Sequence, residues 1–295
     1  VYDPAQIMEE VLAIKPDMIF LWDEAWCAYA RFSPILRRRT AMWSADFLRK
    51  RFASRSYQTE YQQWRDEFDA LDPDDDATWL NRKLMPDPAK ARVRVYATHS
   101  THKTLTALRQ GSMIHVHDQD FEHHARNAFN EAYMTHTSTS PNYQILATLD
   151  VGRRQVELEG YEMVGRSIEL AMMLRERIES DPLISKYFKV LRPGEMILPQ
   201  YRPSGLETYY KKGQGWGSMD KAWLSDEFVL DPTRVTLYVG RTGLDGDSFK
   251  QMLMDRFDIQ INKTSRNTVL FMIHIGMTRG TIAHHEPCVA AGTCG

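Results

Sequence analysis

Apolar residues in the N-terminal part of the chain alternate between helical and strand-like spacing. Residues 5–14 carry apolar side chains at helical spacing, and the short apolar run at 17–26 follows as a predicted strand. Two further apolar runs, at 93–100 and 112–118, are also predicted strands. A helix followed by a buried strand and a polar loop is typical of α/β proteins. We therefore expect an α/β domain with a mostly parallel sheet.

Three segments outside these strands have the spacing of helices. Residues 44–71 are rich in charged and aromatic side chains and are predicted to be an insertion of surface helices. Residues 121–134 are predicted to form a helix. Two long helices are predicted over 142–180. Pro141 and Asn142 fit the start of the first of them.

From about residue 187 the chain changes to shorter strands and turns. The predicted strands are KYFKVL, EMILP, RVTLYVG, DIQIN and NTVLFMIHI, and SFKQMLMDRF is a predicted helix between the last few. Such strands with one crossing helix indicate a smaller α+β domain. The predicted organisation is part of a large α/β domain at 1–180, a small α+β domain at 181–280 and an irregular tail at 281–295.

The composition is that of a soluble globular protein, with 43% hydrophobic and 26% charged residues. A formal net charge of -2 gives no indication of binding to nucleic acid or to an anionic membrane. No apolar stretch approaches the ~20 residues that a membrane-spanning helix needs. The cysteines Cys27, Cys288 and Cys294 are too few for a disulfide framework, which favours a cytoplasmic location.

Two of the predicted strands end beside residues suited to pyridoxal phosphate chemistry. Asp23 lies near the end of the run at 17–26, and Lys103 follows the run at 93–100. A lysine amine forms the Schiff base with this cofactor, and a carboxylate keeps the pyridine nitrogen protonated so that the ring accepts electrons. Taken singly, Lys103 would be an exposed loop lysine and Asp23 a helix cap or surface carboxylate. Their order and their places after buried strands favour a cofactor site.

The neighbours of these two residues fit a site for a flat ring. Ala25 leaves room for the face of a ring, while Trp26 either lines the pocket or packs in the core. Ser100, Thr101 and His102 are hydrogen-bonding residues that could hold a phosphate beside the lysine.

Several motifs occur in one order along the chain and together resemble a single family. They are Asp23-Glu24-Ala25-Trp26, Phe32-Ser33-Pro34, Ser100-Thr101-His102-Lys103, Gln110-Gly111-Ser112-Met113-Ile114-His115-Val116 and His136-Thr137-Ser138-Thr139-Ser140-Pro141. Stretches at 231–237 and 267–271 extend the match. In these residues the chain resembles the bacterial ornithine/lysine/arginine decarboxylases. Those are pyridoxal-phosphate enzymes of the aspartate-aminotransferase fold type (fold type I).

The resemblance implies a role for each matching residue. Lys103 would be the Schiff-base lysine and Asp23 the partner of the pyridine nitrogen, while Ser100 and His102 would contact the cofactor phosphate or flank the Schiff base. The implied catalytic residues are Lys103, His102 and Asp23, and the implied residues that bind pyridoxal 5'-phosphate are Lys103, Asp23, Ala25, Trp26, Ser100, His102 and Ser138.

The resemblance also implies the reaction and the assembly. The expected reaction is decarboxylation of lysine, arginine or ornithine to the corresponding amine, with His102 or Lys103 delivering a proton to Cα. The family's loop that matches Ser138 approaches the active site of the neighbouring subunit. We therefore expect a homo-oligomer with shared active sites, and neither nucleic acid nor a membrane as a partner.

Two departures from the family pattern qualify these expectations. The family places a receiver-like wing and the first part of the cofactor domain ahead of the point that matches Val1, so we expect this chain to be a fragment. Several relatives have a glutamate that holds the distal amino group of the substrate where this chain has Asn262. An amide cannot pair with an ammonium as a carboxylate does. Asp258 or an acid across the dimer remain alternatives, and the substrate stays open.

Three other interpretations of these residues compete with this one. A non-catalytic assembly or binding protein on the same fold would need none of Lys103, Asp23 and His102. The stretch His115-Val116-His117-Asp118 could hold a metal, but its spacing to His124 fits no closed metal motif, and no metal is expected. The glycines at 213–217 lack the strand and helix of a dinucleotide site, so they are predicted to form a turn.

Overall fold

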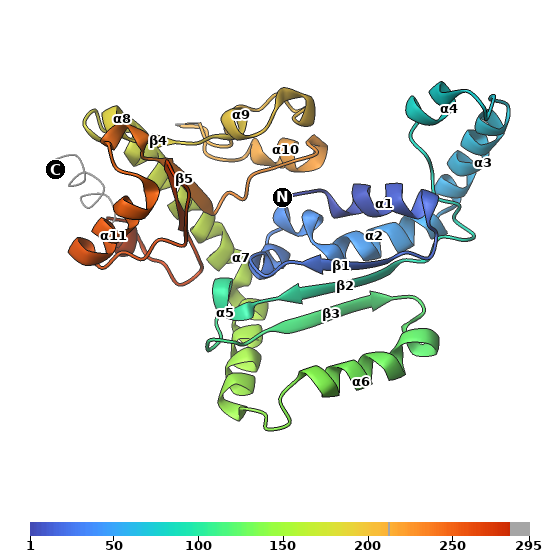
Figure 1. The fold of residues 1–295 in the computed structure, drawn as a ribbon, viewed down its shortest axis with the longest axis horizontal. Helices are drawn as coiled ribbons and strands as arrows, with labels where there is room; N and C mark the ends of the chain where they lie inside the picture. Colours follow the sequence, from blue (N-terminus) through green and yellow to red (C-terminus); the bar gives the residue numbers. More distant parts are fainter. Residues whose placement is uncertain (212, 284–295) are drawn as a thin grey trace. The chain divides into compact units, whose positions relative to one another are not determined.

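A computed structural model describes residues 1–211 and 213–283 of the protein. These residues form two compact units (Figure 1). The N-terminal unit holds residues 3–154, and the C-terminal unit holds residues 1–2 together with the described residues from 155 onward. The division falls inside helix α7 (Tyr143–Ser180), ahead of the predicted domain boundary after residue 180. That boundary stays a prediction.

The N-terminal unit is built on a three-stranded sheet in the order β1-β2-β3. Strand β1 (Ile19–Asp23) runs parallel to β2 (Arg94–His99), and β3 (Met113–Asp118) runs antiparallel to β2. The prediction of a mostly parallel sheet is therefore correct for one pairing and wrong for the other. A parallel pair needs a long crossover, which the helices between β1 and β2 supply. The segment between β2 and β3 holds only a four-residue helix, so the chain turns back.

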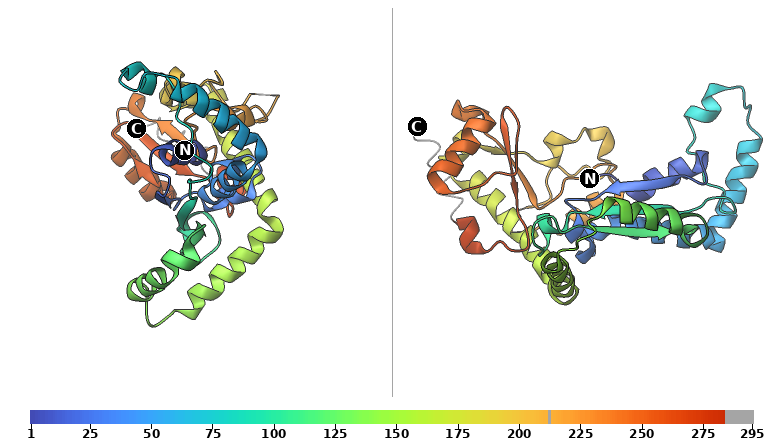
Figure 2. Two further views of the ribbon diagram at one scale, coloured as in Figure 1. Left: turned by 90° about the vertical axis from the view of Figure 1, so that its right-hand side faces the viewer. Right: turned by 60° about the horizontal axis from the view of Figure 1, so that its bottom comes forward.

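One face of this sheet carries the core of the unit. Helices α1 (Pro4–Ile14) and α2 (Ala41–Ala53) pack on the sheet. Val95 and Ala97 of β2 are fully buried with Leu48 of α2. The prediction that 44–71 forms surface helices is wrong for α2 for this reason. It is correct for α3 (Arg55–Asp69), which stands away from the sheet with only Tyr57 buried (Figure 2).

The opposite face of the sheet is more open. Leu21 of β1 points to that face and is 72% exposed, because residues alternate between the two faces along a strand. Tyr96 of β2 lies on the same face and stacks on Phe129 of α6 (Arg126–His136), with ring centroids 6.2 Å apart. Shorter helices complete the unit at Ala28–Phe32 (η1), Leu36–Arg39 (η2), Asp76–Leu80 (α4), Thr101–Thr104 (α5) and Phe121–Ala125 (η3).

The C-terminal unit combines antiparallel strands with helices, as expected of an α+β domain. Its sheet has the order β4-β5-β7-β6, with strands at Lys189–Val190 (β4), Arg234–Tyr238 (β5), Thr268–Met272 (β7) and Lys263–Thr264 (β6). Residues of the second half of α7 and of α11 (Gly246–Phe257) form the core with these strands. The remaining helices are Ile184–Tyr187 (α8), Pro193–Met196 (α9), Pro199–Tyr201 (η4), Met219–Ser225 (α10) and Gly240–Thr242 (η5).

Three predictions for these segments are wrong. Residues 142–180 form a single helix of 38 residues rather than two. The stretch EMILP (195–199) is not a strand: its first two residues end helix α9, and Pro199 begins η4. Pro193 starts the helical turn of α9, and Glu195 accepts a hydrogen bond from the Arg192 backbone at 3.1 Å. Residues 258–262 precede strand β6 rather than forming it.

Of the predicted irregular tail, residues 281–283 are helical, and Ile282 is fully buried in the C-terminal core. The rest of that predicted tail, with Cys288 and Cys294, lies outside the described residues. Among the described residues, no helix combines the length and the apolar character that crossing a lipid bilayer requires.

Candidate active site

Asp23 and Lys103 lie at the same end of the N-terminal sheet, where the carboxyl ends of β1 and β2 meet. This end is called the sheet edge below. Asp23 ends β1 and lies opposite Thr98 of β2 in the parallel register. Helix α5, which contains Lys103, begins two residues after β2 ends. Carboxyl ends of adjacent parallel strands point the same way, and this is where α/β proteins bind ligands. Both side chains are exposed. The structure thus brings the predicted carboxylate and the predicted amine to one edge.

The loop after β1 is shaped by Asp23 itself. One carboxylate oxygen of Asp23, Oδ1, accepts a hydrogen bond from the Ala25 backbone at 3.0 Å. This bond turns the chain so that Ala25 and Trp26, both half-buried, follow directly at the sheet edge. The second oxygen, Oδ2, has no hydrogen-bond partner within the described part of the chain. It can therefore accept a bond from a ligand.

The loop after β2 is fixed by bonds to its own backbone. The Lys103 amide donates to the Ser100 carbonyl at 3.0 Å, and His102 Nδ1 donates to the Gly111 carbonyl at 2.9 Å. That bond assigns the Nδ1–H tautomer to His102 and leaves Nε2 as an acceptor. A Cβ on Gly111 would lie 3.1 Å from Ala107 Cβ and Leu149 Cδ2, so a larger residue there would require these neighbours to shift.

Two buried hydroxyl groups flank Lys103. Thr101 and Thr104 are each 3% exposed, and within residues 1–211 and 213–283 neither Oγ1 has a hydrogen-bond partner. Buried polar atoms in proteins normally have partners, so these two are suited to bonding a ligand. An amine, a carboxylate and free hydroxyls are the donor and acceptor set that pyridoxal phosphate needs. The residues present fit that cofactor. The sequence named Thr101 among the hydrogen-bonding neighbours of Lys103 without giving it a specific role, and it gave no indication of Thr104.

A buried polar cluster lies next to this edge, on the core side of the sheet. Glu24 is 6% exposed, and its Oε2 lies 2.9 Å from His99 Nε2. The ring of His115 on β3 lies 4.5 Å from that of His99, centroid to centroid. The cluster was not predicted from the sequence. Strand alternation could have indicated it, because Glu24 and His99 continue the core-facing series of Trp22 and Ala97.

The structure does not connect Ser138 with the other predicted site residues. It lies in the exposed loop after α6, and its Oγ accepts a hydrogen bond from the Ser140 backbone at 3.1 Å. Its predicted contact with the site of a neighbouring subunit stays a prediction.

The histidine-rich strand β3 has a structural role. Asp118 Oδ1 accepts from Arg94 Nε at 3.0 Å, and Asp118 Oδ2 accepts from the Tyr96 hydroxyl at 2.8 Å. Burial and that hydrogen bond raise the pKa of Tyr96 to about 12. His117 points to the core face, where burial lowers its pKa. No group of three or more metal-binding side chains occurs among the residues that the structure describes.

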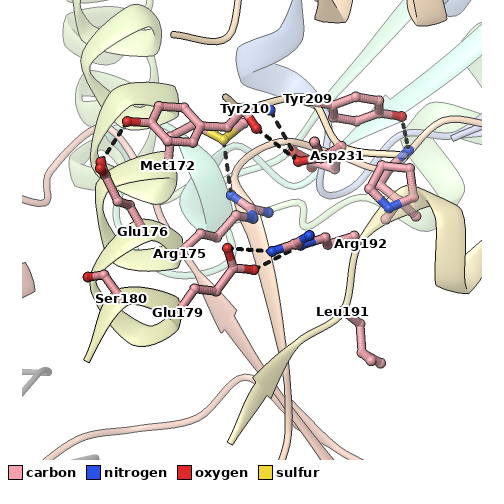
Figure 3. Close-up of a pocket in the computed structure, with 13 residues that line it drawn as sticks. Met172, Arg175, Glu176, Glu179, Ser180, Leu191, Arg192, Tyr209, Tyr210 and Asp231 are labelled. Atoms are coloured by element: carbon pink, nitrogen blue, oxygen red, sulfur yellow. Dashed lines mark hydrogen bonds and ion pairs between the residues drawn. The ribbon is translucent and has the colours of Figure 1, made fainter. Parts of the chain in front are cut away.

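The C-terminal unit contains a cavity of about 380 Å³ (Figure 3). Its charged side chains bond to groups of the same unit. Arg192 pairs with Glu179 at 2.7 Å, and Glu176 accepts a hydrogen bond from the Tyr210 hydroxyl at 2.6 Å. Arg175 donates to two backbone carbonyls, at 2.7 and 2.6 Å. None of the predicted site residues lines the cavity, and its charges stabilise the unit itself.

Comparisons with known proteins agree with the motifs. Residues 81–281 match the family described as Orn/Lys/Arg decarboxylase, major domain. The lysine decarboxylase of Hafnia alvei is 32% identical over 199 residues, which are 63% of this chain and 25% of that protein. The biodegradative arginine decarboxylase of Escherichia coli K12 is 24% identical over 295 residues, covering 88% of this chain and 32% of its own length. The chain thus spans between a quarter and a third of these relatives.

Solved structures show the same fold. The constitutive lysine decarboxylase of Escherichia coli aligns with a TM-score of 0.59 and 21% identity, over 99% of this chain and 34% of that one. Lysine decarboxylase A of Pseudomonas aeruginosa aligns with a TM-score of 0.60 and 22% identity, over 98% and 34%. With the family match covering more than half of its residues, the chain belongs to the Orn/Lys/Arg decarboxylase family.

Proposed function

We propose that the protein is a pyridoxal-phosphate-dependent decarboxylase of a basic amino acid, releasing carbon dioxide and an amine. The observation that carries this proposal is the position of Asp23 and Lys103 at one edge of the sheet, after adjacent parallel strands. The buried hydroxyls of Thr101 and Thr104 beside Lys103 support it. Names of curated relatives, which include lysine, arginine and ornithine decarboxylases, support the substrate class.

The chemistry of each residue at this site suggests a separate role for it in the reaction. Pyridoxal phosphate, when bound, supplies the electron sink for the bond that breaks when the carboxylate leaves. The free Oδ2 of Asp23 holds a proton on the pyridine nitrogen. Lys103 Nζ would hold the cofactor covalently, and either Lys103 Nζ or His102 Nε2, once that nitrogen has taken up a proton, would deliver a proton to the substrate Cα. Ser100 and the two threonine hydroxyls would bind the cofactor phosphate, while Ala25 and Trp26 would lie beside the ring.

The second part of the proposal concerns the assembly. Ser138 makes only a local turn, in a loop that is exposed throughout. An exposed serine loop is available to another subunit, and we assign it to the active site of a neighbouring copy. The protein would then be a cytoplasmic homo-oligomer that needs two chains for each complete site.

A non-catalytic binding protein is the alternative. It would give no reason for the unpartnered threonine hydroxyls beside an exposed lysine. The two functions are distinguished by adding pyridoxal phosphate to the natural, full-length protein, removing the unbound cofactor by gel filtration and recording the absorbance of the protein. A decarboxylase of this kind turns yellow and releases amine from its substrate, whereas a binding protein without the cofactor stays colourless.

The substrate is tested by product analysis. The natural protein is offered lysine, arginine and ornithine separately, and the amines are quantified by chromatography. Asn262 lies exposed just before β6, at the position where the family resemblance leads us to expect an acid. If that residue contacts the distal amino group, Asn262→Glu should lower KM for the basic substrates. An equal KM in both proteins would assign the recognition to another residue, with Asp258→Asn as the next variant.

A further inference from the structure

We propose that Glu24 and His99 form a positioning pair that holds the ends of β1 and β2 together, and with them Asp23 and Lys103. This inference rests on the proposed function. Asp23 directly precedes Glu24, and Lys103 lies in the helix that follows His99. The pair faces the core, while Asp23 lies on the open face of the sheet. It therefore acts on the site through the backbone and touches no substrate.

Three bonds of Glu24 reach two other segments of the chain. Its backbone amide donates to the Thr98 carbonyl at 3.0 Å, which continues the β1–β2 pairing by one residue. Its Oε2 lies 2.9 Å from His99 Nε2. Its Oε1 accepts from the backbone amide of Ala41 at 2.7 Å. One side chain thus ties together the end of β1, the end of β2 and the start of α2.

The bond to Ala41 replaces a missing cap. Thr40 precedes helix α2, but its side chain makes no capping hydrogen bond. The first amides of a helix lack intrahelical partners and carry a partial positive charge, so a carboxylate is stabilised there. Glu24 supplies that carboxylate from a distant part of the chain. Because a buried carboxylate without partners is costly, the arrangement holds Glu24 in one place.

The surroundings of His99 favour the same geometry. His115 is the other titratable group against it, and its pKa is lowered by burial and then by His99. Because an ionised carboxylate can only accept a hydrogen bond, His99 Nε2–H donates to Glu24. His115 Nε2 is buried and has no hydrogen-bond partner among the residues described. It therefore does not compete with His99 for the carboxylate.

The pair would affect the site through the distance between Asp23 and Lys103. A displacement of about 1 Å between reacting groups can lower a rate by about 10²-fold. Loss of the pair frees both strand ends, so the carboxylate of Asp23 and the amine of Lys103 lose their fixed separation. Cofactor affinity and turnover should fall, while the substrate KM stays close to its original value.

The test compares Glu24→Ala, Glu24→Gln and the exposed control Glu60→Ala in the natural, full-length protein. Glutamine can still accept from Ala41 and can donate to His99 in its other tautomer. We expect Glu24→Ala to weaken pyridoxal phosphate binding by at least about tenfold and to lower kcat by about 10²-fold with KM little changed. Glu24→Gln should recover most of both, and Glu60→Ala should change neither.

A second measurement does not depend on activity. Hydrogen–deuterium exchange of the cofactor-free protein should rise in residues 20–30 and 97–105 together in Glu24→Ala. If Glu24→Ala does not fold, His99→Leu replaces it in the test, because that variant keeps the Glu24–Ala41 bond. His99→Leu should raise the exchange of both segments together. His99→Gln should return the exchange to that of the unsubstituted protein. If residues 97–105 of Glu24→Ala or His99→Leu exchange no faster than those of Glu60→Ala, the proposed role of the Glu24–His99 pair is wrong. Failure of the unsubstituted protein to bind the cofactor would instead contradict the proposed function, and the exchange result would still decide the pair.

Discussion

Asp23 lies opposite Thr98 in the parallel register of β1 and β2, so its carboxylate stands at the edge from which the Lys103 loop leaves the sheet. Residues far apart in sequence are thereby brought to one place by a single backbone pairing. The pairing also separates two functions by side-chain direction. Asp23 points to the open face, where a cofactor can reach it, and Glu24 points to the core, where it holds the strands.

Asp23 is expected to matter for its charge rather than for folding. Asp23→Ala removes both the turn bond to Ala25 and the charge, whereas Asp23→Asn keeps an acceptor for Ala25 without the charge. If the carboxylate keeps the pyridine nitrogen protonated, both variants should lose activity by roughly 10²–10⁴-fold, the usual range for a proton-transfer partner. Steady-state decarboxylation rates measure this. Near-normal activity in Asp23→Asn would rule out the assigned role.

Shared active sites can be tested by complementation. Lys103→Ala and Ser138→Trp subunits are each expected to be inactive as homo-oligomers, since one lacks the amine and the other blocks a neighbouring site. Mixed oligomers would regain one complete site, giving up to about a quarter of the original activity for random dimers. Activity is measured after refolding the two variants together. Mixtures no more active than either parent would show that Ser138 serves its own subunit or none.

The core of the N-terminal unit depends on helix α2. Leu48 is fully buried against the sheet, so Leu48→Ala should destabilise the unit by about 2–5 kcal/mol. Lys50, exposed on the same helix, serves as the control, and Lys50→Ala should cost less than about 0.5 kcal/mol. Calorimetric unfolding of both variants gives the comparison. Equal midpoints would show that α2 does not pack as described.

Acid should destabilise the N-terminal unit through its buried histidines. Burial lowers the pKa values of His115 and His117 below the ordinary value of 6.5. The unfolded chain therefore binds more protons than the folded one between 6.5 and the lower folded pKa values. The contribution of the neutral histidines is complete above pH 6.5 and is lost as the pH falls below it. Unfolding midpoints at pH 7.5 and 5.5 should differ less in His115→Leu than in the original protein.

Local features of the sequence were enough to recognise the family and to propose a site. Asp23 and Lys103 each follow a short apolar run, and the family resemblance carried by these motifs is confirmed by the match over residues 81–281. Helix α1 and strands β1, β2 and β3 were also recognisable from their apolar spacing. These elements were predicted correctly because they depend on residues that are close together in the chain.

Features that depend on distant pairing were not predictable in the same way. The direction of β3 follows from how the Lys103 loop turns, and the burial of α2 follows from which sheet face it meets. The Glu24–His99 bond depends on the register between β1 and β2. A single sequence shows which residues of a strand share a face, but it does not show which residues of other strands or helices they contact.

The most direct test of the account is the identity of the cofactor-binding amine. The natural, full-length protein is incubated with pyridoxal 5'-phosphate, reduced with borohydride, digested and analysed by peptide mass spectrometry, with Lys103→Ala as the control. The account predicts one stable phosphopyridoxyl adduct, on Lys103, that is absent from the variant. An adduct on another lysine, or none, would contradict it.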